Sequence, residues 1–307
     1  MRKLHTDVVP VVVTYNPDES TLINNLNALL SQTQFVVVVD NHSMHDVTGI
    51  IQHLDKEYCD RINLIKLQHN NGLGSAFNTG IAAARDLNAH FVLLMDQDSI
   101  PGSDMLHALR SAHIYLENQG KKVGAVGPRY RHHATTEASD FVRLGQFGFI
   151  RGACEEQNDL VQADFLISSG SLISLNALNA IGGMDKDLFI DHIDTEWCFR
   201  AQSKGFKLYG VCSAVMQHSL GEQRIRLWFG RWRTIAYHQP FRYYYMFRNS
   251  VLLWQRSYMS TVWKRADKLR ILSLFIFFTL FSSNRIANLR MILKGLNDGF
   301  NRRTGKL

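Results

Sequence analysis

The sequence predicts an α/β protein built on a doubly wound parallel sheet, followed by a basic region of different character. Apolar, mostly β-branched runs alternate four times with helix-like spacings within about the first 100 residues. Connections of that length favour a parallel sheet with helices on its faces. After residue 219 the alternation stops, and long segments rich in arginine, lysine and aromatic residues follow.

Each of the four expected strands ends in polar residues. The strands are expected at Val8–Thr14, Phe35–Val39, Ile62–Leu67 and Phe91–Met95. Leucines at helical spacing after a cap at Asp18 or Ser20 predict the first helix, a second is expected through about Tyr58, and a third begins near Ser75. Because the carboxyl ends of parallel strands share one edge, where ligands bind, we expect a nucleotide-sized cleft there.

The second half is less regular. A helix over Ser103–Asn118 and a strand over Val123–Val126 precede a polar, loop-rich segment at 129–160. Further strands are expected within Val161–Leu175 and over Lys207–Met216, with a helix between them. The chain after residue 219 is expected to be helical through about residue 299.

Charge is divided unevenly along the chain. Residues 1–218 hold 17 Lys/Arg against 24 Asp/Glu, a balance of −7, and residues 219–307 hold 17 against 3, a balance of +14. In the basic region the cations alternate with Trp228, Phe229, Trp232, Tyr243, Tyr244, Tyr245, Trp254 and Trp263. Such aromatics are typical of membrane interfaces, so an anionic membrane surface is the expected partner. A single-stranded nucleic acid is the alternative, but it leaves the acidic N-terminal part unexplained.

Attachment to one membrane face, rather than insertion, is expected. The most apolar run, Ile271–Phe281, has 11 residues, and a spanning helix needs about 20. No secretory signal is expected, because Asp7 and Pro10 interrupt the N-terminal apolar run. The four cysteines show no metal or redox spacing, so reduced, mostly buried thiols in a cytoplasmic protein are expected. The expected location is therefore the inner face of the cytoplasmic membrane.

The fourth strand runs into Asp96-Gln97-Asp98. Two carboxylates at the ligand-binding edge of a sheet suit a divalent cation that bridges phosphate oxygens, because hard cations take oxygen ligands. A solvated turn is the alternative for an isolated motif of this kind.

Polar residues after the other strands extend the candidate site. Thr14, Asn16 and Asp40 are candidates for binding a base or a ribose, although each is also an ordinary turn former. The run from Asn71 to Asn78 includes Gly74 and opens a helix whose N–H groups suit phosphate. It lacks the third glycine of a dinucleotide-binding loop, which argues against a dehydrogenase.

Asp194 is the candidate for proton transfer. It lies at an expected helix start between Asp191 and Glu196, where acids can also serve only as caps. Trp197, three residues later, is a candidate for stacking on a sugar, and His218 after the next strand is a candidate metal ligand or phosphate donor. Alternatively, His218 is an ordinary surface histidine.

The ordered motifs resemble family-2 glycosyltransferases with the GT-A fold. They are Thr14-Tyr15-Asn16, Asp40-Asn41-His42-Ser43, Asn71-Gly72-Leu73-Gly74 with Asn78 and Gly80, Asp96-Gln97-Asp98, Gly182-Gly183-Met184-Asp185 and Asp194 through Arg200. The resemblance covers about residues 7–220. It implies a mixed sheet with a nucleotide half at about 1–128 and an acceptor half at 129–219, followed by a helical, membrane-associating region at 220–307. The later motif from Tyr243 to Asn249 is similar to bacterial rhamnosyltransferases of O-antigen and other surface polysaccharides.

The resemblance implies inverting transfer from a nucleotide sugar, with dTDP-L-rhamnose as donor and a saccharide, lipid-linked through a polyprenyl diphosphate, as acceptor. Asp98 would hold Mg²⁺ or Mn²⁺, Asp96 would contact the ribose or a water of the metal, and Asp40 the base. Asp194 falls on the catalytic-base position. The residue before it is Ile193, where the family often has an acid, so Glu196 stays open as an alternative base.

Three alternative functions remain at this point. One is the same chemistry with a UDP-hexose or UDP-N-acetylhexosamine donor. Another is a non-catalytic, membrane-bound protein that binds carbohydrate or nucleotide, although such a protein would not need Asp96, Asp98 and Asp194 together. The last is the nucleic-acid-binding protein that the basic region alone would allow.

Overall fold

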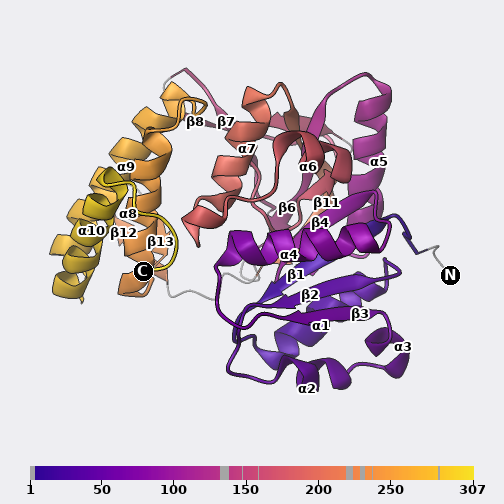
Figure 1. The fold of residues 1–307 in the computed structure, drawn as a ribbon. Coiled ribbons are helices and arrows are strands. Elements are labelled where there is room, and N and C mark those ends of the chain that lie inside the picture. The colour runs from indigo at the N-terminus through magenta and orange to yellow at the C-terminus, as the bar shows by residue number, and fades with distance from the viewer. Residues whose placement is uncertain are drawn as a thin grey trace. The chain divides into compact units, whose positions relative to one another are not determined.

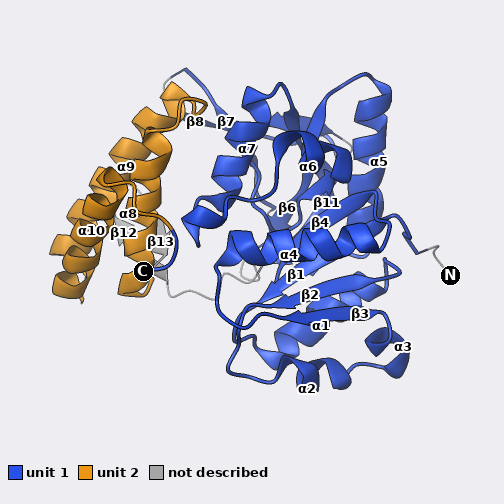
Figure 2. Cartoon of the chain, in the orientation of Figure 1, with its two compact units in different colours: residues 1–219, 305–307 blue, residues 220–304 orange. Residues whose placement is uncertain are grey.

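The computed structural model describes residues 4–131, 138–146, 148–157, 159–218, 224–228, 232–236, 238–282 and 284–307. Figure 1 shows the elements in chain order. They divide into two compact units, which are residues 1–219 with 305–307 (unit 1) and residues 220–304 (unit 2), coloured separately in Figure 2. Each unit is described by itself.

The first half of unit 1 contains four parallel strands in the order β3-β2-β1-β4. The strands are β1 (Val8–Thr14), β2 (Val36–Asp40), β3 (Ile62–Lys66) and β4 (Phe91–Asp96). The helices between them are α1 (Glu19–Leu30), α2 (Val47–Gln52), α3 (Lys56–Cys59) and α4 (Leu73–Asp86). The prediction of a single helix after the second strand is wrong, because the two short helices α2 and α3 take its place. Asp18 caps α1 by accepting a hydrogen bond from the Thr21 N–H.

The second half of unit 1 makes the sheet mixed. Its strands are β5 (Ser99–Pro101), β6 (Val123–Arg131), β9 (Leu160–Ala163), β10 (Leu172–Ser174) and β11 (Lys207–His218). Its helices are α5 (Met105–Asn118), α6 (Leu175–Ile181), the 3-10 turn η1 (Lys186–Leu188) and α7 (Ile193–Ser203). Strand β10 runs antiparallel between β4 and β6, whereas β11 is parallel to β6 and antiparallel to β5 and β9. The segment expected to be loop-rich holds a separate ribbon of β7 (Phe141–Leu144) and β8 (Phe149–Gly152).

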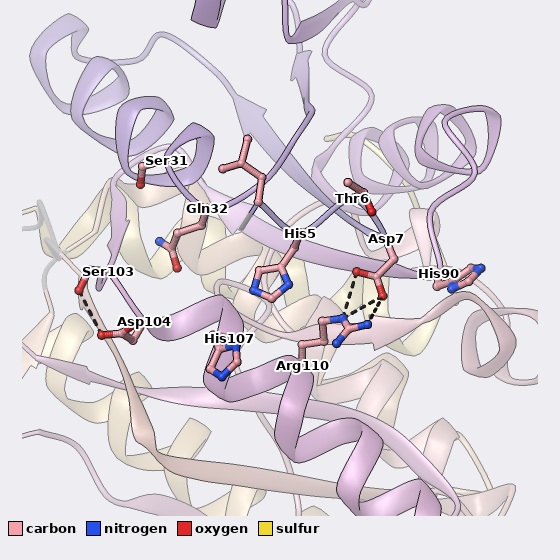
Figure 3. Close-up of a pocket in the computed structure, with 11 residues that line it drawn as sticks. His5, Thr6, Asp7, Ser31, Gln32, His90, Ser103, Asp104, His107 and Arg110 are labelled. Carbon is pink, nitrogen blue, oxygen red and sulfur yellow. Dashed lines mark hydrogen bonds and ion pairs between the residues drawn. The ribbon is translucent and has the colours of Figure 1, made fainter. Parts of the chain in front are cut away.

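The amino-terminal edge of the sheet has a pocket of about 860 Å³ (Figure 3). Asp7, directly before β1, accepts hydrogen bonds from Arg110 of α5 at 2.8 and 3.0 Å, which neutralises the guanidinium. The rings of His5 and His107 stack with centroids 5.9 Å apart. Ligands of open α/β sheets bind at the carboxyl edge, and this pocket contains none of the predicted site residues.

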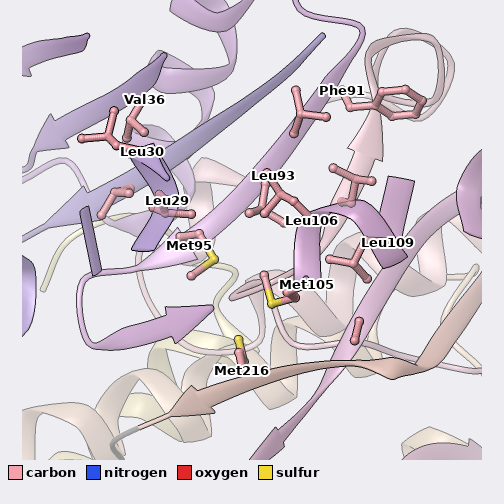
Figure 4. Packing of buried hydrophobic residues seen from close by; sticks show 14 of the residues in the cluster. Leu29, Leu30, Val36, Phe91, Leu93, Met95, Met105, Leu106, Leu109 and Met216 are labelled. Atoms are coloured by element: carbon pink, nitrogen blue, oxygen red, sulfur yellow. The ribbon is translucent and has the colours of Figure 1, made fainter. Parts of the chain in front are cut away.

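The core of unit 1 lies between the sheet and its helices. Phe91 to Met95 of β4 are all buried, which means that both faces of this strand are covered. Figure 4 shows Leu93 and Met95 packed with Leu106 and Leu109 of α5 and with Met216 of β11. A strand enclosed in this way holds the residues at its end in a defined place, and those residues are Asp96 to Asp98.

Unit 2 begins with an antiparallel ribbon, so the expectation of helices directly after residue 219 is wrong. The ribbon pairs β12 (Arg224–Trp228) with β13 (Trp232–Ala236). The helices α8 (Pro240–Trp254), α9 (Thr261–Leu280) and α10 (Arg285–Phe300) follow. Within the described ranges, no helix is both long and apolar enough to cross a membrane.

Most of the aromatic residues expected at a membrane interface lie inside unit 2. Tyr243, Tyr244, Tyr245 and Trp263 are buried, and Trp254 is partly buried with its indole N–H donating to Asp267 at 2.9 Å. These residues form part of the helical core, so their proposed interfacial role is wrong. The side chains of Trp228, Phe229 and Trp232 lie outside the described residues.

Candidate active site

The ends of β1, β2 and β4 meet at one edge of the sheet. The register pairs Thr14 with Asp40 and Val13 with Asp96, which places two predicted acids on the two neighbours of β1. The Thr14 hydroxyl donates to Asp40 at 3.2 Å, and Ser43 donates to the same carboxylate through its N–H and its hydroxyl. Asp40 is only 5% exposed, so a small part of its surface faces solvent. Thr14 is fully buried and hydrogen-bonds Asp40, and its direct contact with a ligand stays a prediction.

Asn16 joins the loops after β1 and β2. Its backbone lies in the left-handed region with φ 47°, which asparagine tolerates better than most residues. Its N–H donates to the Ser43 hydroxyl at 2.8 Å, and its side-chain oxygen accepts the Met44 N–H at 2.7 Å. The predicted meeting of the two loops is therefore confirmed, whereas direct contact of Asn16 with a ligand stays a prediction.

The Asp96–Asp98 turn is held by two amide side chains, those of Gln97 and Asn25. Gln97 receives the Tyr15 N–H at 2.8 Å and donates to the Tyr15 carbonyl at 3.3 Å. The buried Asn25 of α1 donates to the carbonyl of Asp96 at 3.1 Å and to that of Ser99. Sequence reasoning missed Asn25, although a polar residue three positions after Leu22 on the apolar face of a helix is a readable signal.

The donor set fits a divalent cation held together with a diphosphate. Asp96 and Asp98 are both partly exposed at the end of β4. Strand pairing puts His218 opposite Ser99, next to this turn, while the His218 side chain lies outside the described residues. The described residues contain no group of three or more histidines, cysteines or acids that could hold a metal. Such a group is not required, because Mg²⁺ commonly takes one or two carboxylates, waters and substrate phosphates.

Asp194 lies in the first turn of α7 and is partly buried as a residue. Its Oδ1 accepts the Thr195 N–H at 2.7 Å, and the backbone of Ser168 provides a further hydrogen bond. Burial raises the pKa of Asp194, and the nearby negative charge of Asp191 raises it further, against the lowering effect of these hydrogen bonds. A carboxylate with a raised pKa is a stronger base, which suits proton abstraction.

One loop contacts both the Asp96 turn and Asp194. Ser168 hydrogen-bonds Asp194 through its backbone, and the hydroxyl of Ser169 accepts the Asp96 N–H at 3.1 Å. The Ser169 hydroxyl also donates to Ser99 at 2.8 Å. The loop is fixed to β4 through Leu94, whose carbonyl accepts the Gly170 N–H at 2.8 Å and whose N–H donates to the Ser171 carbonyl at 3.0 Å. The candidate base and the candidate metal-binding turn therefore both contact this loop, the first through Ser168 and the second through Ser169.

The segment before α7 is strained. Phe189, Asp191 and His192 all have φ near +64°, an uncommon conformation for residues with side chains. Around Phe189 (φ 64°, ψ −63°) the Ile190 N–H donates to the Leu188 carbonyl at 2.8 Å, which makes a rare γ-turn. Such strain persists only where the surroundings over-determine it, and it is often found at functional sites.

The glycine loop supplies that support, which changes its predicted role. The Leu73 N–H donates to the Phe189 carbonyl at 2.7 Å. A Cβ on Gly72, whose φ is +85°, would lie 2.6 Å from the same carbonyl oxygen, and one on Gly74 would lie 2.7 Å from the Asp185 carbonyl oxygen. The loop is thus packed against the turn before α7, which gives Gly74 a structural role, and its predicted contact with a ligand stays a prediction. Asn71 donates its N–H to Asn41 at 3.0 Å, and ligand binding by its side chain stays a prediction.

Asn78 strengthens the same contact between the glycine loop and the segment before α7, which we call the clasp. Its side-chain amide donates to the Met184 carbonyl and accepts the Met184 N–H, both at 2.8 Å. This pair of bonds joins α4 to the turn that carries Gly182 and Gly183. Because both ends of the amide are engaged, the predicted contact of Asn78 with the nucleotide sugar is not supported.

Glu196 and Trp197 are buried and engaged within unit 1. Glu196 is 1% exposed and binds Arg200 through two parallel hydrogen bonds of 2.8 and 2.9 Å. Trp197 is 2% exposed and its indole N–H donates to the Gly182 carbonyl at 2.9 Å. Both residues lie on the inner side of α7, so the structure gives no support to their predicted acceptor-binding role, which stays a prediction. The buried ion pair also leaves Asp194 as the better-placed base of the two acids.

The cysteine prediction is wrong for one pair. Cys154 and Cys212 form a disulfide with Cα atoms 5.8 Å apart, although 58 positions separate them in the chain. Cys198 is a free, buried thiol, as expected, and burial raises its pKa. No local spacing could reveal the pair, because β11 brings Cys212 to the segment after β8.

Solved structures with similar folds are glycosyltransferases. GalNAc-T7, solved with UDP, GalNAc and Mn²⁺, superposes with a TM-score of 0.58 at 13% identity, covering 96% of this chain and 56% of that one. S. aureus TarS 1–349 superposes with a TM-score of 0.56 at 17% identity, covering 95% of this chain and 81% of that one. At these identities the likeness defines the fold alone, which is GT-A with an additional helical C-terminal region.

Sequence comparison adds a family match over part of the chain and two curated relatives. Residues 11–147 match Glycosyl transferase family 2. The dTDP-rhamnosyl transferase RfbF of Shigella flexneri is 28% identical over 83% of this chain and 82% of its own length. The low-salt glycan biosynthesis hexosyltransferase Agl10 of Haloferax volcanii is 25% identical over 68% of this chain and 66% of its own. The match to Glycosyl transferase family 2 is confined to residues 11–147, and with the two relatives it shows that the chain is a glycosyltransferase.

Proposed function

We propose that this enzyme transfers L-rhamnose from dTDP-L-rhamnose, with inversion, to a hydroxyl group of a lipid-linked saccharide during the synthesis of a cell-surface polysaccharide. The name of the Shigella flexneri relative supports the donor. The observation that supports the chemistry best is the Ser168–Ser169 loop, which contacts the Asp194 carboxylate and the Asp96 turn through adjacent residues.

In the proposed reaction Asp194 takes the proton of the acceptor hydroxyl as its oxygen attacks C1 of the sugar. The bond between C1 and the diphosphate oxygen breaks, and the nucleoside diphosphate leaves with its electron pair. One displacement inverts the anomeric centre, and no covalent enzyme intermediate is needed. The Thr195 N–H holds the carboxylate at 2.7 Å, so the base enters the reaction already oriented.

Asp98, with Asp96 and His218 close by, is proposed to hold Mg²⁺ or Mn²⁺ on the donor diphosphate. When bound, the cation supplies positive charge that stabilises the leaving group. The Mn²⁺ and UDP of the GalNAc-T7 structure support this assignment. Asp96 is proposed to contact the ribose and Asp40 the base, through the small part of its carboxylate that is exposed.

We place the enzyme on the cytoplasmic face of a bacterial membrane, attached through unit 2 to anionic lipid. The basic balance of residues 219–307, 17 against 3, supports this location. The exposed aliphatic residues of α9 and α10, which include Leu269, Leu272, Ile286 and Leu293, replace the buried tyrosines as the apolar contribution.

A donor panel tests the proposal. Transfer to a saccharide acceptor and hydrolysis in its absence are measured with Mg²⁺ for dTDP-L-rhamnose, UDP-hexoses, UDP-N-acetylhexosamines and GDP-sugars. We expect turnover with dTDP-L-rhamnose, loss of turnover in EDTA and an inverted anomeric configuration in the product. Turnover with a UDP-sugar alone would replace the donor while keeping the reaction class.

A further inference from the structure

Unit 2 contains an open pocket of about 670 Å³ that the transfer reaction does not use. Pro240, at the start of α8, forms one wall, and the first turns of α10 form the other. The remaining lining residues are Asn284, Arg285, Ile286, Ala287, Arg290, Met291 and Lys294.

Three cations at this pocket, Arg285, Arg290 and Lys294, are exposed and have no acidic partner among the described residues. The two acids of unit 2 that the structure describes are buried and engaged elsewhere. Asp267 binds Arg270 at 2.6 Å, and Asp298 binds Arg303 at 3.2 Å. The positive charge around the pocket is therefore not neutralised within the described part of unit 2.

Apolar side chains adjoin the cations. Ile286 lines the pocket and is 82% exposed, while Phe241 and Leu293, each about half exposed, are the sequence neighbours of the lining residues Pro240 and Lys294. A fully polar anion would satisfy the cations but would leave these surfaces in water. Clustered arginines and lysines beside exposed apolar residues match a ligand with a phosphate on an apolar body.

We infer that this pocket binds the phosphate headgroup of an anionic membrane lipid, with Arg285, Arg290 and Lys294 on the phosphate and Ile286 against the acyl region. This inference deepens the proposed membrane attachment and rests on it. It assigns the attachment to one pocket instead of to the summed charge of unit 2.

The test compares two double variants of the full chain that lose the same charge. Arg285→Gln/Arg290→Gln removes cations of the pocket, and Arg265→Gln/Lys268→Gln removes exposed cations of α9 that do not line it. Binding is measured by flotation with phosphatidylcholine vesicles that contain phosphatidylglycerol. Circular dichroism melting checks that both variants fold like the parent.

The pocket variant should bind these vesicles on the order of 30-fold more weakly, because each cation at an anionic surface contributes about 1 kcal/mol. The α9 variant should lose less than about fivefold, the effect of one such cation. Equal losses would show that net charge alone matters and would overturn the pocket while leaving the membrane attachment in place. A parent chain that does not bind these vesicles would overturn both the pocket and the membrane attachment.

A further arm separates a lipid from free phosphate. Ile286→Ser should weaken vesicle binding but leave unchanged any thermal stabilisation by inorganic phosphate. If inorganic phosphate stabilises the parent and not the pocket variant, while Ile286→Ser binds vesicles like the parent, the ligand is a free phosphate and the lipid assignment is wrong.

Discussion

Replacing Glu196 by glutamine should destabilise unit 1 without removing the group that takes the proton. Glu196 is 1% exposed and binds Arg200 through two charge-assisted hydrogen bonds of 2.8 and 2.9 Å. Glutamine keeps the size and one acceptor, but its amide N–H₂ group faces a guanidinium donor. The variant therefore loses one charge-assisted bond, worth about 1.5–3 kcal/mol, and leaves a positive charge without its partner.

The exposure of Arg200 limits the cost. Its side chain is 19% exposed, so water recovers part of what full burial would lose. It also keeps its hydrogen bonds to the Ile181 and Gly183 carbonyls, at 2.9 and 2.7 Å. We therefore expect a loss near the lower end of the buried-pair range, about 3 kcal/mol. For a unit of this size that corresponds to a fall in Tm of about 6–12 °C.

Glu57→Gln is the matched control. Glu57 pairs with Arg61 at the same helical spacing, but at 3.7 Å and with 83% of its side chain exposed. Its loss should stay below about 0.5 kcal/mol. Calorimetry on both variants and transfer assays at a temperature where both are folded give the comparison. A Glu196→Gln variant that melts like the parent, or that is folded and inactive, would refute the structural role assigned to Glu196.

Three further predictions concern the clasp, the metal and the pH profile. Gly72→Ala should lower both Tm and kcat because its Cβ would meet a carbonyl oxygen at 2.6 Å. Gly120→Ala, also at positive φ but with nothing within 4 Å, should lower the free energy of unfolding only by its backbone strain, about 1–2 kcal/mol, and leave kcat unchanged. Equal effects of the two variants on Tm and kcat would contradict the role of the clasp. Asp98→Ala should abolish the Mg²⁺ dependence of donor affinity measured by calorimetric titration, and an unchanged dependence would exclude Asp98 as a ligand. Asp191→Asn removes a negative charge that raises the pKa of Asp194, so the acidic limb of the kcat/KM profile should move to lower pH. If the limb stays in place, it does not report the titration of Asp194.

The nucleotide half could be predicted closely because its signals are local. Val8–Thr14 matches β1 residue for residue, and Phe91–Met95 extends by one residue into the acid that ends β4. A strand that is buried on both faces is a continuous apolar run in the sequence, and turn residues such as Pro17 and Gly72 mark the loops between these runs and the helices. The ribbon inside 129–160 and the antiparallel β10 depend on pairings between distant segments, which no periodicity reveals.

The candidate site divides in the same way. Asp96, Asp98 and Asp194 could be chosen because acids at the ends of elements stand out in a sequence. Glu196 and Trp197 could not be excluded, since the side of α7 that is buried depends on the turn before it. That turn is strained at Phe189, and its support comes from Gly72, more than 100 positions earlier in the chain.

The most direct test of the account is the transfer rate of Asp194→Asn, with donor binding measured alongside. Asparagine keeps the size and one acceptor for the Thr195 N–H but cannot take the proton. The account predicts a fall in transfer of about 10²–10⁴-fold, with donor affinity unchanged. Transfer at the parent rate in a variant that binds the donor normally would contradict the assignment of Asp194 as the base.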